Sequence, residues 1–287
     1  MSKFLQGRVW FSMEQLMVLL MWGTFLLVGG LFLWIIGDIL WKGIEQISWE
    51  FVTESPQNSG REGGIASILV STAMVVSICM LAALPIGVGT AIWLVEFTSS
   101  NRPASRFLRI SLDVLAAMPS IVFGLFGNAF FCVALGLGFS ILSGGLTLAC
   151  MVLPFIIRTS AEALYAVPSS YRYGAAALGL SRASTLWNII LPEAMSGIVA
   201  GFLLGMGRAL AETAALLFTS GYVDRMPESI LDSGRTISIH IYDLSMNVPG
   251  GEPSAYGSAI VLIIVLLLIN LMVLWIVRHW RQKRLTR

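Results

Sequence analysis

Long apolar runs, separated by short polar segments, make up most of this chain. Runs of roughly 20 residues are long enough to cross a ~30 Å hydrocarbon layer as helices. The pattern predicts six such spans, with glycines around residues 136–145 marking the narrow gap between the third and the fourth. The predicted spans are 14–40, 64–95, 111–137, 140–158, 196–222 and 256–277. We therefore expect an all-α polytopic membrane protein with about six transmembrane helices.

Composition and charge agree with this expectation. Hydrophobic residues make up 56% of the chain and charged residues only 12%, with a mean hydropathy of +0.82, whereas about a quarter of residues are charged in soluble domains. If the amino terminus is cytoplasmic, thirteen lysines and arginines lie on the inner side and four on the outer side. This asymmetry predicts that both termini are cytoplasmic. We expect the first span to remain as a helix, since it is too long for a signal peptide.

The basic carboxy-terminal tail, residues 279–287, is interpreted as an anchor beside anionic lipid rather than a nucleic-acid site. The residues that enzymes need are scarce, with two histidines and three cysteines in the whole chain. The cysteines fall within predicted spans, at spacings that suit neither a disulfide framework nor a metal site. The chain also lacks a Gly-x-x-x-x-Gly-Lys-[Ser/Thr] phosphate loop, a His-Glu-x-x-His motif and a nucleophile elbow. We expect no enzyme activity, no metal and no cofactor bound by this chain.

Two charged residues, Arg208 and Glu212, lie deep within the fifth predicted span. Arg208 falls ~17 Å from the start of that span, near the bilayer centre, where a charge costs ~3 kcal/mol or more unless it faces protein or water. On a helical wheel both residues share a stripe of small residues that includes Gly197, Gly201 and Gly205. Such a stripe is expected to turn away from lipid.

The stripe is expected to continue through Ala215 and Thr219. Two interpretations of the Arg208–Glu212 pair remain open. An ion pair one helical turn apart would only hold helices together. Alternatively the pair marks an anion pathway, because an arginine stays ionised and its planar fork suits oxyanions, while Glu212 neutralises Arg208 when no substrate is present. A bundle that needs only adhesion could use serine or threonine at lower cost, which favours the anion pathway.

A polar segment rich in small residues separates the fourth and fifth spans. Pro168-Ser-Ser is typical of a helix start with serine as the cap, and Gly179 is typical of a helix end. Ser181 is placed to cap a second short helix that ends or kinks at Pro192. The pattern predicts two short helices that form a compact protrusion, which is either a docking surface or a surface loop without a partner.

The same segment carries a recognisable signature. Tyr173-Gly174-Ala175-x3-Gly179-x9-Ile189-x-Leu191-Pro192 resembles the cytoplasmic loop signature of bacterial ABC importer permeases, written Glu-Ala-Ala-x3-Gly-x9-Ile-x-Leu-Pro. The glycine, isoleucine, leucine and proline stand at the family's spacing. Tyr173 replaces the acidic residue and Gly174 the first alanine. A contact that depends on the acid is therefore not expected to carry over, whereas the helix–turn–helix shape is.

Three further segments are similar to phosphate importer permeases of the PstA type, and the resemblance covers roughly residues 64–278. They are Leu115-Ala-Ala-Met-Pro119-Ser120-Ile-Val-Phe-Gly124-Leu-Phe-Gly127, Leu153-Pro-Phe-Ile-Ile-Arg158-Thr-Ser160 and Gly207-Arg208-Ala-Leu-Ala-Glu212-Thr-Ala214. The resemblance implies a type I ABC importer permease architecture. In the third span, the residue pair Pro119-Ser120 either breaks the helix or only bends it.

The resemblance implies that the chain is a permease subunit of an ATP-driven importer for inorganic phosphate in the bacterial inner membrane. Arg158, Arg208 and Glu212 would line the substrate pathway, with a positively charged anchor at the membrane edge as the alternative for Arg158. The residues that would couple the permease to an ATPase are Pro168, Tyr173, Gly174, Ala175, Gly179 and Pro192. The expected partners are a second related permease, two ATPase subunits that bind ATP and magnesium, an extracytoplasmic phosphate-binding protein and membrane lipid.

The expected organisation has three parts. Residues 1–63 form an N-terminal transmembrane helix and the first outer loop, residues 64–278 form the permease core with the coupling loop at 159–195, and residues 279–287 form the basic cytoplasmic tail. The alternatives are an importer of another oxyanion such as sulfate or tungstate, an ATP-independent secondary anion transporter, and a scaffold subunit that does not conduct. The protruding loop favours the importer, because a self-contained carrier needs no such docking surface.

Overall fold

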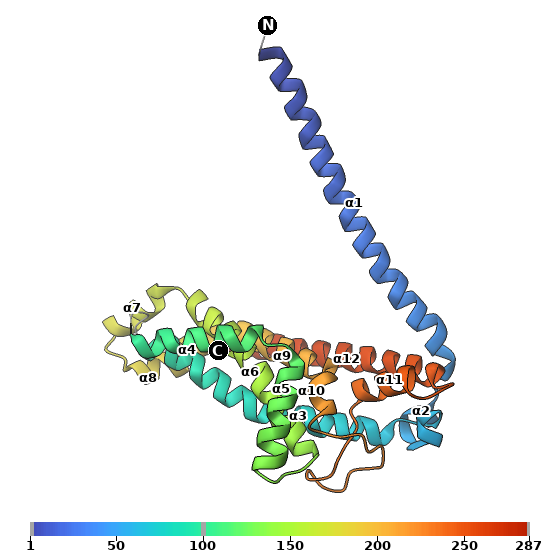
Figure 1. Ribbon diagram of the computed structural model, residues 1–287. Coiled ribbons are helices and arrows are strands. Elements are labelled where there is room, and N and C mark those ends of the chain that lie inside the picture. Colours follow the sequence, from blue (N-terminus) through green and yellow to red (C-terminus); the bar gives the residue numbers. More distant parts are fainter. Residues whose placement is uncertain (1–2, 99–101, 286–287) are drawn as a thin grey trace.

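The computed structural model describes residues 3–98 and 102–285, with the backbone alone at 3–12 and 280–285. It is a bundle of long helices joined by short helical turns (Figure 1). The long elements are α1 (Lys3–Gly43), α3 (Ala66–Ile92), α4 (Pro103–Ala117), α5 (Ser120–Gly127), α6 (Ile141–Ala166), α9 (Leu191–Ala211) and α12 (Glu252–Leu285). The shorter helices are α2 (Trp49–Thr53), α7 (Ser169–Ala177), α8 (Arg182–Thr185), α10 (Ala214–Leu217) and α11 (Ile237–Met246).

Short 3₁₀ and π-helical turns complete the chain, together with one antiparallel hairpin in which Pro56 pairs with Gly63. The 3₁₀ turns are η1 (Ile44–Gln46) and η2 (Asn58–Gly60), and the hairpin strands are β1 (Pro56–Gln57) and β2 (Glu62–Gly63). The π-helical turns are η3 (Trp93–Phe97), η4 (Asn128–Ala134) and η5 (Leu186–Ile190).

Helices α3, α6 and α9 form the centre of the bundle, and their packing depends on glycines. A side chain at Gly145 of α6 would meet Ile78 of α3 at 2.6 Å, and one at Gly201 of α9 would meet the Thr159 hydroxyl of α6 at 2.1 Å. Glycine at such positions lets two helix backbones approach closely. The prediction that the glycine stripe of the fifth span turns away from lipid is confirmed, because this stripe packs on α6.

Helix α1 leaves the bundle beside α2 and projects away from the other long helices (Figure 1). Most of its residues from Met13 to Leu40 are exposed. Its last turn touches α12, where Lys42 Nζ donates to Tyr256 Oη at 3.3 Å. Within α1, Lys42 Nζ also donates to Asp38 Oδ2 at 2.9 Å. The predicted boundary near residue 63 stays a prediction.

Within residues 3–98 and 102–285, five single helices are long and apolar enough to cross a membrane, and one bent pair brings the total to six if it forms one span. The single spans are Met13–Gln46, Ala66–Phe97, Ile141–Ala166, Arg182–Ala211 and Glu252–His279. The bent pair corresponds to the third predicted span, whose two parts, Pro103–Ala117 and Ser120–Ala134, meet at 103°. The expectation of one continuous helix over 111–137 is therefore wrong, and the alternative in which Pro119 breaks it is confirmed. Met118 is extended, with ψ at 136°, as a residue before proline prefers.

The predicted bounds of the fifth span, 196–222, are also wrong. It begins earlier, at Arg182, and α9 ends at Ala211. Glu212 is extended, with ψ at 129°, and its carbonyl oxygen accepts a hydrogen bond from Ser238 Oγ. Because α9 ends at Ala211, the stripe does not continue along one helix through Ala215.

The two ends of the bundle carry different segments. Helices α7 and α8 lie at one end, and α2 and α11 lie at the other (Figure 1). This agrees with the predicted division between cytoplasmic and outer loops, while the side of the membrane that each end faces stays a prediction. Helix α12 continues to Leu285, and the cationic side chains of the predicted tail from Arg281 onwards lie outside the described residues, as do those of Lys3 and Arg8.

Candidate functional site

Arg208 lies in the last turn of α9, with its guanidinium carbon 4.5 Å from the centre of the Phe155 ring. Phe155 is the fifteenth of 26 residues in α6. The contact therefore lies close to the midpoint of a helix long enough to cross the membrane. A cation over an aromatic face is attracted by the ring, but Arg208 remains exposed on the isolated chain. Its charge is thus open to whatever covers α6 and α9.

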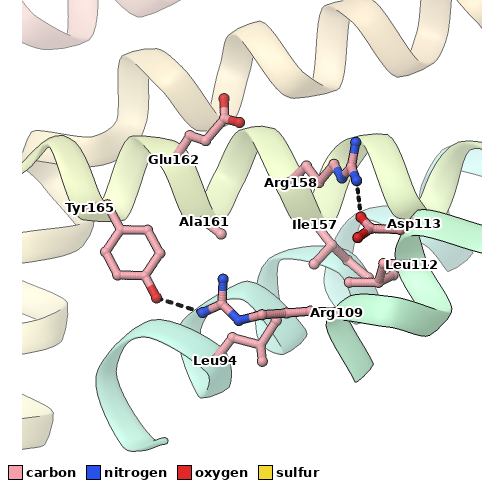
Figure 2. A pocket seen from close by; sticks show the side chains of 9 residues that line it. All are labelled: Leu94, Arg109, Leu112, Asp113, Ile157, Arg158, Ala161, Glu162 and Tyr165. Atoms are coloured by element: carbon pink, nitrogen blue, oxygen red, sulfur yellow. Dashed lines mark hydrogen bonds and ion pairs between the residues drawn. The ribbon is translucent and has the colours of Figure 1, made fainter. Parts of the chain in front are cut away.

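Arg158 lies three residues after Phe155, on the same face of α6. Its Nη2 donates to Asp113 Oδ1 of α4 (Figure 2), and the two side chains are 50% and 60% exposed. Eight residues of α6 follow Arg158. The helix therefore continues beyond the predicted end at residue 158, and the alternative of an anchor at the membrane edge stays a prediction. The structure brings Arg158 and Arg208 to one level of α6, because Arg208 lies over the ring of Phe155 and Arg158 follows Phe155 by three residues.

A cavity of about 360 Å³ opens between α4 and α6 beside the Arg158–Asp113 pair. Arg109 and Glu162 also line it, and Arg109 Nη2 donates to Tyr165 Oη at 2.7 Å (Figure 2). The cavity thus contains two guanidinium groups and two carboxylates. An oxyanion could use the donors of Arg158 once the Asp113 carboxylate moves away, because an arginine binds a carboxylate and an oxyanion with the same fork.

Glu212 does not lie beside Arg208 as a pair one helical turn apart. Its Oε1 accepts from the backbone N–H of Ala215 at 3.3 Å, so the carboxylate caps the start of α10. Within residues 3–98 and 102–285 no ion pair joins Arg208 to Glu212. The predicted neutralisation of Arg208 by Glu212 is therefore wrong for this conformation, because the helix that would align them ends between them.

The loop at 159–195 forms the tip of the bundle and contains α7. Gly179 ends α7 with φ at +71°, a conformation that glycine adopts without strain. Ser181 Oγ accepts from the backbone N–H of Ser184 at 3.2 Å. The predicted helix end and second cap are confirmed. The predicted serine cap of the first helix is wrong, since Pro168 holds the cap position and the serines lie within the first turn.

The second short helix of the predicted protrusion is not separate. Elements α8, η5 and α9 run on as one span from Arg182 to Ala211, so the prediction that Pro192 ends or kinks a short helix is wrong. Pro192 lies at the first positions of α9, directly after the π-helical turn η5. A π turn widens the helix ahead of the proline ring, which lets the helix continue past a residue that lacks an N–H.

The outer surface of the tip is apolar and aromatic. Tyr173, Leu178 and Trp187 are 75%, 80% and 68% exposed. A side chain at Gly174 would meet nothing within 4 Å. Ala175 is different, since it is 2% exposed and supports the tip from within. Of the predicted coupling residues, Tyr173 and Gly174 are therefore open to a partner and Ala175 is not.

Sequence reasoning missed Asp113, Arg172 and Glu96. Asp113 is the ion-pair partner of Arg158, and Arg172 of α7 donates to Glu96 at 2.6 Å. Both acids fall at the edges of predicted spans, and a charge at such a position is the signal that could have found them. Among the residues described, no group of three or more His, Cys, Asp or Glu side chains is placed to hold a metal ion.

Residues 83–285 match the family described as the binding-protein-dependent transport system inner membrane component. The chain belongs to this family. It is 32% identical over 253 residues to the probable ABC transporter permease protein YqgI of Bacillus subtilis (strain 168), covering 83% of this chain and 86% of that protein. It is 33% identical over 240 residues to the phosphate transport system permease protein PstA 2 of Mycobacterium bovis, covering 83% and 78%. This permease is thus a transport subunit of an ABC importer.

Solved structures show the same fold. A chain of the MetNI methionine ABC transporter, in an inward-facing conformation, superposes on this permease with a TM-score of 0.58 at 18% identity, covering 75% of this chain and 94% of that one. A chain of a bacterial ABC transporter involved in the import of the acidic polysaccharide alginate gives 0.58 at 13% identity, covering 89% and 96%. The predicted type I importer permease architecture is confirmed.

Proposed function

We propose that this permease is the PstA-type subunit of an ATP-driven importer for inorganic phosphate and forms part of its translocation pathway. The observation that carries the proposal is a pair of arginines at one level of α6: Arg208, over the ring of Phe155 near the midpoint of that helix, and Arg158, three residues after Phe155. Both are exposed on the isolated chain. Acyl chains solvate such charges poorly, at a cost of ~3 kcal/mol or more each, so this face is expected to border protein or a water-filled path.

The chemistry of the two side chains suits an oxyanion. Arginine stays ionised at any physiological pH, and its planar donors match the oxygens of a phosphate. The same donors would also fit sulfate or tungstate. Relatives named as phosphate transport system permeases, from Mycobacterium bovis, Mycobacterium tuberculosis and Xylella fastidiosa, favour phosphate for this chain.

The tip at α7 is proposed as a docking site for an ATPase. Two ATPase subunits, which would hold ATP and magnesium, would bind the inner loops of the two permeases. The exposed side chains of the tip, Tyr173, Leu178 and Trp187, offer an apolar contact instead of an acidic one. A second related permease would cover the face that carries Arg208, and an extracytoplasmic phosphate-binding protein would reach the end with α2 and α11. In this arrangement both chain termini lie in the cytoplasm and lipid surrounds the remaining faces.

Purification of the tagged chain in mild detergent, followed by reconstitution, tests this proposal. We expect a separate ATPase and a second permease to accompany the chain, and we expect the reconstituted complex to take up phosphate when ATP is supplied on the ATPase side. A chain that carries phosphate alone, driven by an ion gradient, would contradict the proposal in favour of a secondary transporter.

A further inference from the structure

Arg172 lies in the first turn of α7, with its side chain turned back towards the bundle. Its neighbours Tyr171 and Tyr173 are 46% and 75% exposed, whereas the Arg172 side chain is 28% exposed. Its Nη2 donates to Glu96 Oε1 at 2.6 Å, and its Nε donates to the two carboxylate oxygens at 3.2 and 3.4 Å. The Glu96 side chain is 17% exposed. The two residues form a bidentate, partly buried ion pair, which is stronger and more directional than a surface contact.

The same guanidinium also binds the end of α6. Nη1 donates to the carbonyl oxygen of Val167 and Nη2 to that of Leu164, both at 2.9 Å. Carbonyls at the end of a helix lack partners within the helix, and a cation there is favoured by the helix dipole. Arg172 therefore uses all three guanidinium nitrogens, which a lysine could not reproduce.

The bonds of Arg172 join α7 to the end of the preceding helix α6 and to η3, which lies 76 residues earlier in the chain. Glu96 belongs to η3 at the end of α3, and the two carbonyls belong to the end of α6. Helices α3 and α6 make the most extensive helix contact in the described chain. Towards its other end α3 is bound to the first residue of α11, where Thr72 Oγ1 accepts from the backbone N–H of Ile237 at 2.9 Å. Closely packed helices move as rigid bodies, so a displacement at Glu96 reaches the opposite end of the bundle.

We propose that the Arg172–Glu96 pair, together with the carbonyls of Leu164 and Val167, transmits movement of α7 to α3 and α6. The inference rests on the proposed function, because it requires ATPase subunits that displace α7. Without these bonds α7 would keep its chain connections and its packing around Ala175 on η5, but no ion pair would tie it to α3. With the bonds of Arg172 in place, α7 moves together with α3 and α6. Arg172 and Glu96 are thus positioning residues that link the docking helix to the membrane spans.

The variants Glu96→Gln and Arg172→Gln test this role in the complete, reconstituted complex. The ATPases should still copurify with the permease, because the exposed aromatic and apolar side chains of the tip are unchanged. Phosphate taken up per ATP hydrolysed should fall at least about fivefold, the lower end of coupling between sites. Arg172→Lys should retain part of the coupling, because it keeps the charge and loses the fork.

Matched controls remove one carboxylate and one guanidinium that do not belong to the Arg172–Glu96 pair. Glu193→Gln and Arg106→Gln change exposed residues of α9 and α4, and uptake per ATP should stay at the wild-type value. An unchanged ratio in Glu96→Gln and Arg172→Gln, or an equal loss in the controls, would overturn the inference. If no ATPase accompanies the wild-type permease, the proposed function itself fails and the inference fails with it.

A distance measurement covers the case in which the variants do not assemble. Spin labels at Ser170→Cys on α7 and Trp93→Cys on η3 leave Arg172 and Glu96 intact, with the native cysteines replaced. We expect the distance between the labels to change by less than ~2 Å between the nucleotide-free and ATP-bound complex, as for segments that move together. A larger change would show that α7 moves independently of α3 and would overturn the inference.

Discussion

At the scale of single residues, the ion pair between Arg158 and Asp113 cannot be explained by stability. Both side chains are half exposed on the isolated chain, and exposed pairs contribute ~0–1 kcal/mol. Asp113 instead occupies the donors that an incoming oxyanion would need. We interpret Asp113 as an internal counter-ion that the transported anion displaces.

Asp113→Asn should therefore change transport more than stability. The free energy of unfolding of the isolated chain should fall by less than ~1 kcal/mol, while the KM for phosphate uptake should fall several-fold because the anion no longer competes with a carboxylate. Glu162→Gln, which removes an acid from the same cavity, is the control and should leave KM closer to wild type. A loss of several kcal/mol with unchanged KM would make the pair a structural brace.

His240 of α11 gives a second prediction at this scale. The residue is fully buried, and neither ring nitrogen has a hydrogen-bond partner in the portion of the chain described here. Burial, reinforced by the nearby Arg235, lowers the pKa of His240 from 6.5 to about 4. In the unfolded chain the imidazole keeps its ordinary pKa of ~6.5. Between these values the unfolded form binds more protons, so stability falls as pH falls from about 6.5 towards 4.

Thermal unfolding in detergent between pH 7 and 4.5 checks this sign. The midpoint of the wild type should decrease across that range, and His240→Phe, which cannot titrate, should flatten the decrease. Asp232 does not interfere, because hydrogen bonds from the backbone N–H groups of Glu228 and Ser229 hold its pKa below 3.8, and its contribution is lost only at lower pH. Identical slopes for wild type and variant would contradict the assignment.

At the scale of elements, two broken helices meet beside α6. One break lies between α4 and α5 at Pro119, and the other lies between α9 and α10 at Glu212. A side chain at Gly124 of α5 would lie 2.9 Å from the Cα of Ala215 in α10, so the two half-helices touch backbone to backbone. Within a membrane, interrupted backbone is tolerated only where protein or water satisfies it. The breaks therefore place polar backbone groups next to the proposed pathway.

The turn at Gly179 gives the prediction for the coupling tip. Gly179→Val places a β-branched side chain at φ +71°, which such residues avoid, and should distort the end of α7 so that the ATPase no longer copurifies. Gly250→Val is the matched control, because this glycine also has a positive φ, +78°, with open space around it, and it lies after α11, away from the tip. Retained ATPase binding in Gly179→Val would remove α7 from the docking site.

The elements were predictable where the cause is local, and the missed features depend on distant residues. Apolar runs predict the spans, the proline at 119 allows for a break, and Gly179 and Ser181 mark turns correctly. Asp113 and Arg158 are 45 residues apart, and Arg172 and Glu96 are 76 apart, so no local pattern pairs them. The carbonyl of Glu212, just after the end of α9, likewise bonds to a residue that lies 26 positions further along the chain, Ser238.

At the scale of the whole molecule, the isolated chain leaves surfaces that require neighbours. Its α1 projects from the bundle (Figure 1), and its face at Phe155 exposes two arginines near the middle of a membrane-spanning helix. The tip at α7 exposes aromatic and apolar side chains beyond the spans. A second permease would cover the face that carries the two arginines, and an ATPase would cover the apolar tip at α7. The chain is therefore interpreted as one part of a larger transporter.

ATP-driven uptake of radiolabelled phosphate into vesicles that contain the complete complex tests the central claim most directly. We predict that wild-type uptake persists in excess sulfate, and that Arg208→Gln lowers it at least ~tenfold, or ~1.4 kcal/mol, while every subunit remains in the complex. The control Arg225→Gln removes an exposed charge from the outer segment and should transport normally. Normal uptake by Arg208→Gln, or inhibition of the wild type by sulfate as strong as by unlabelled phosphate, would contradict the account.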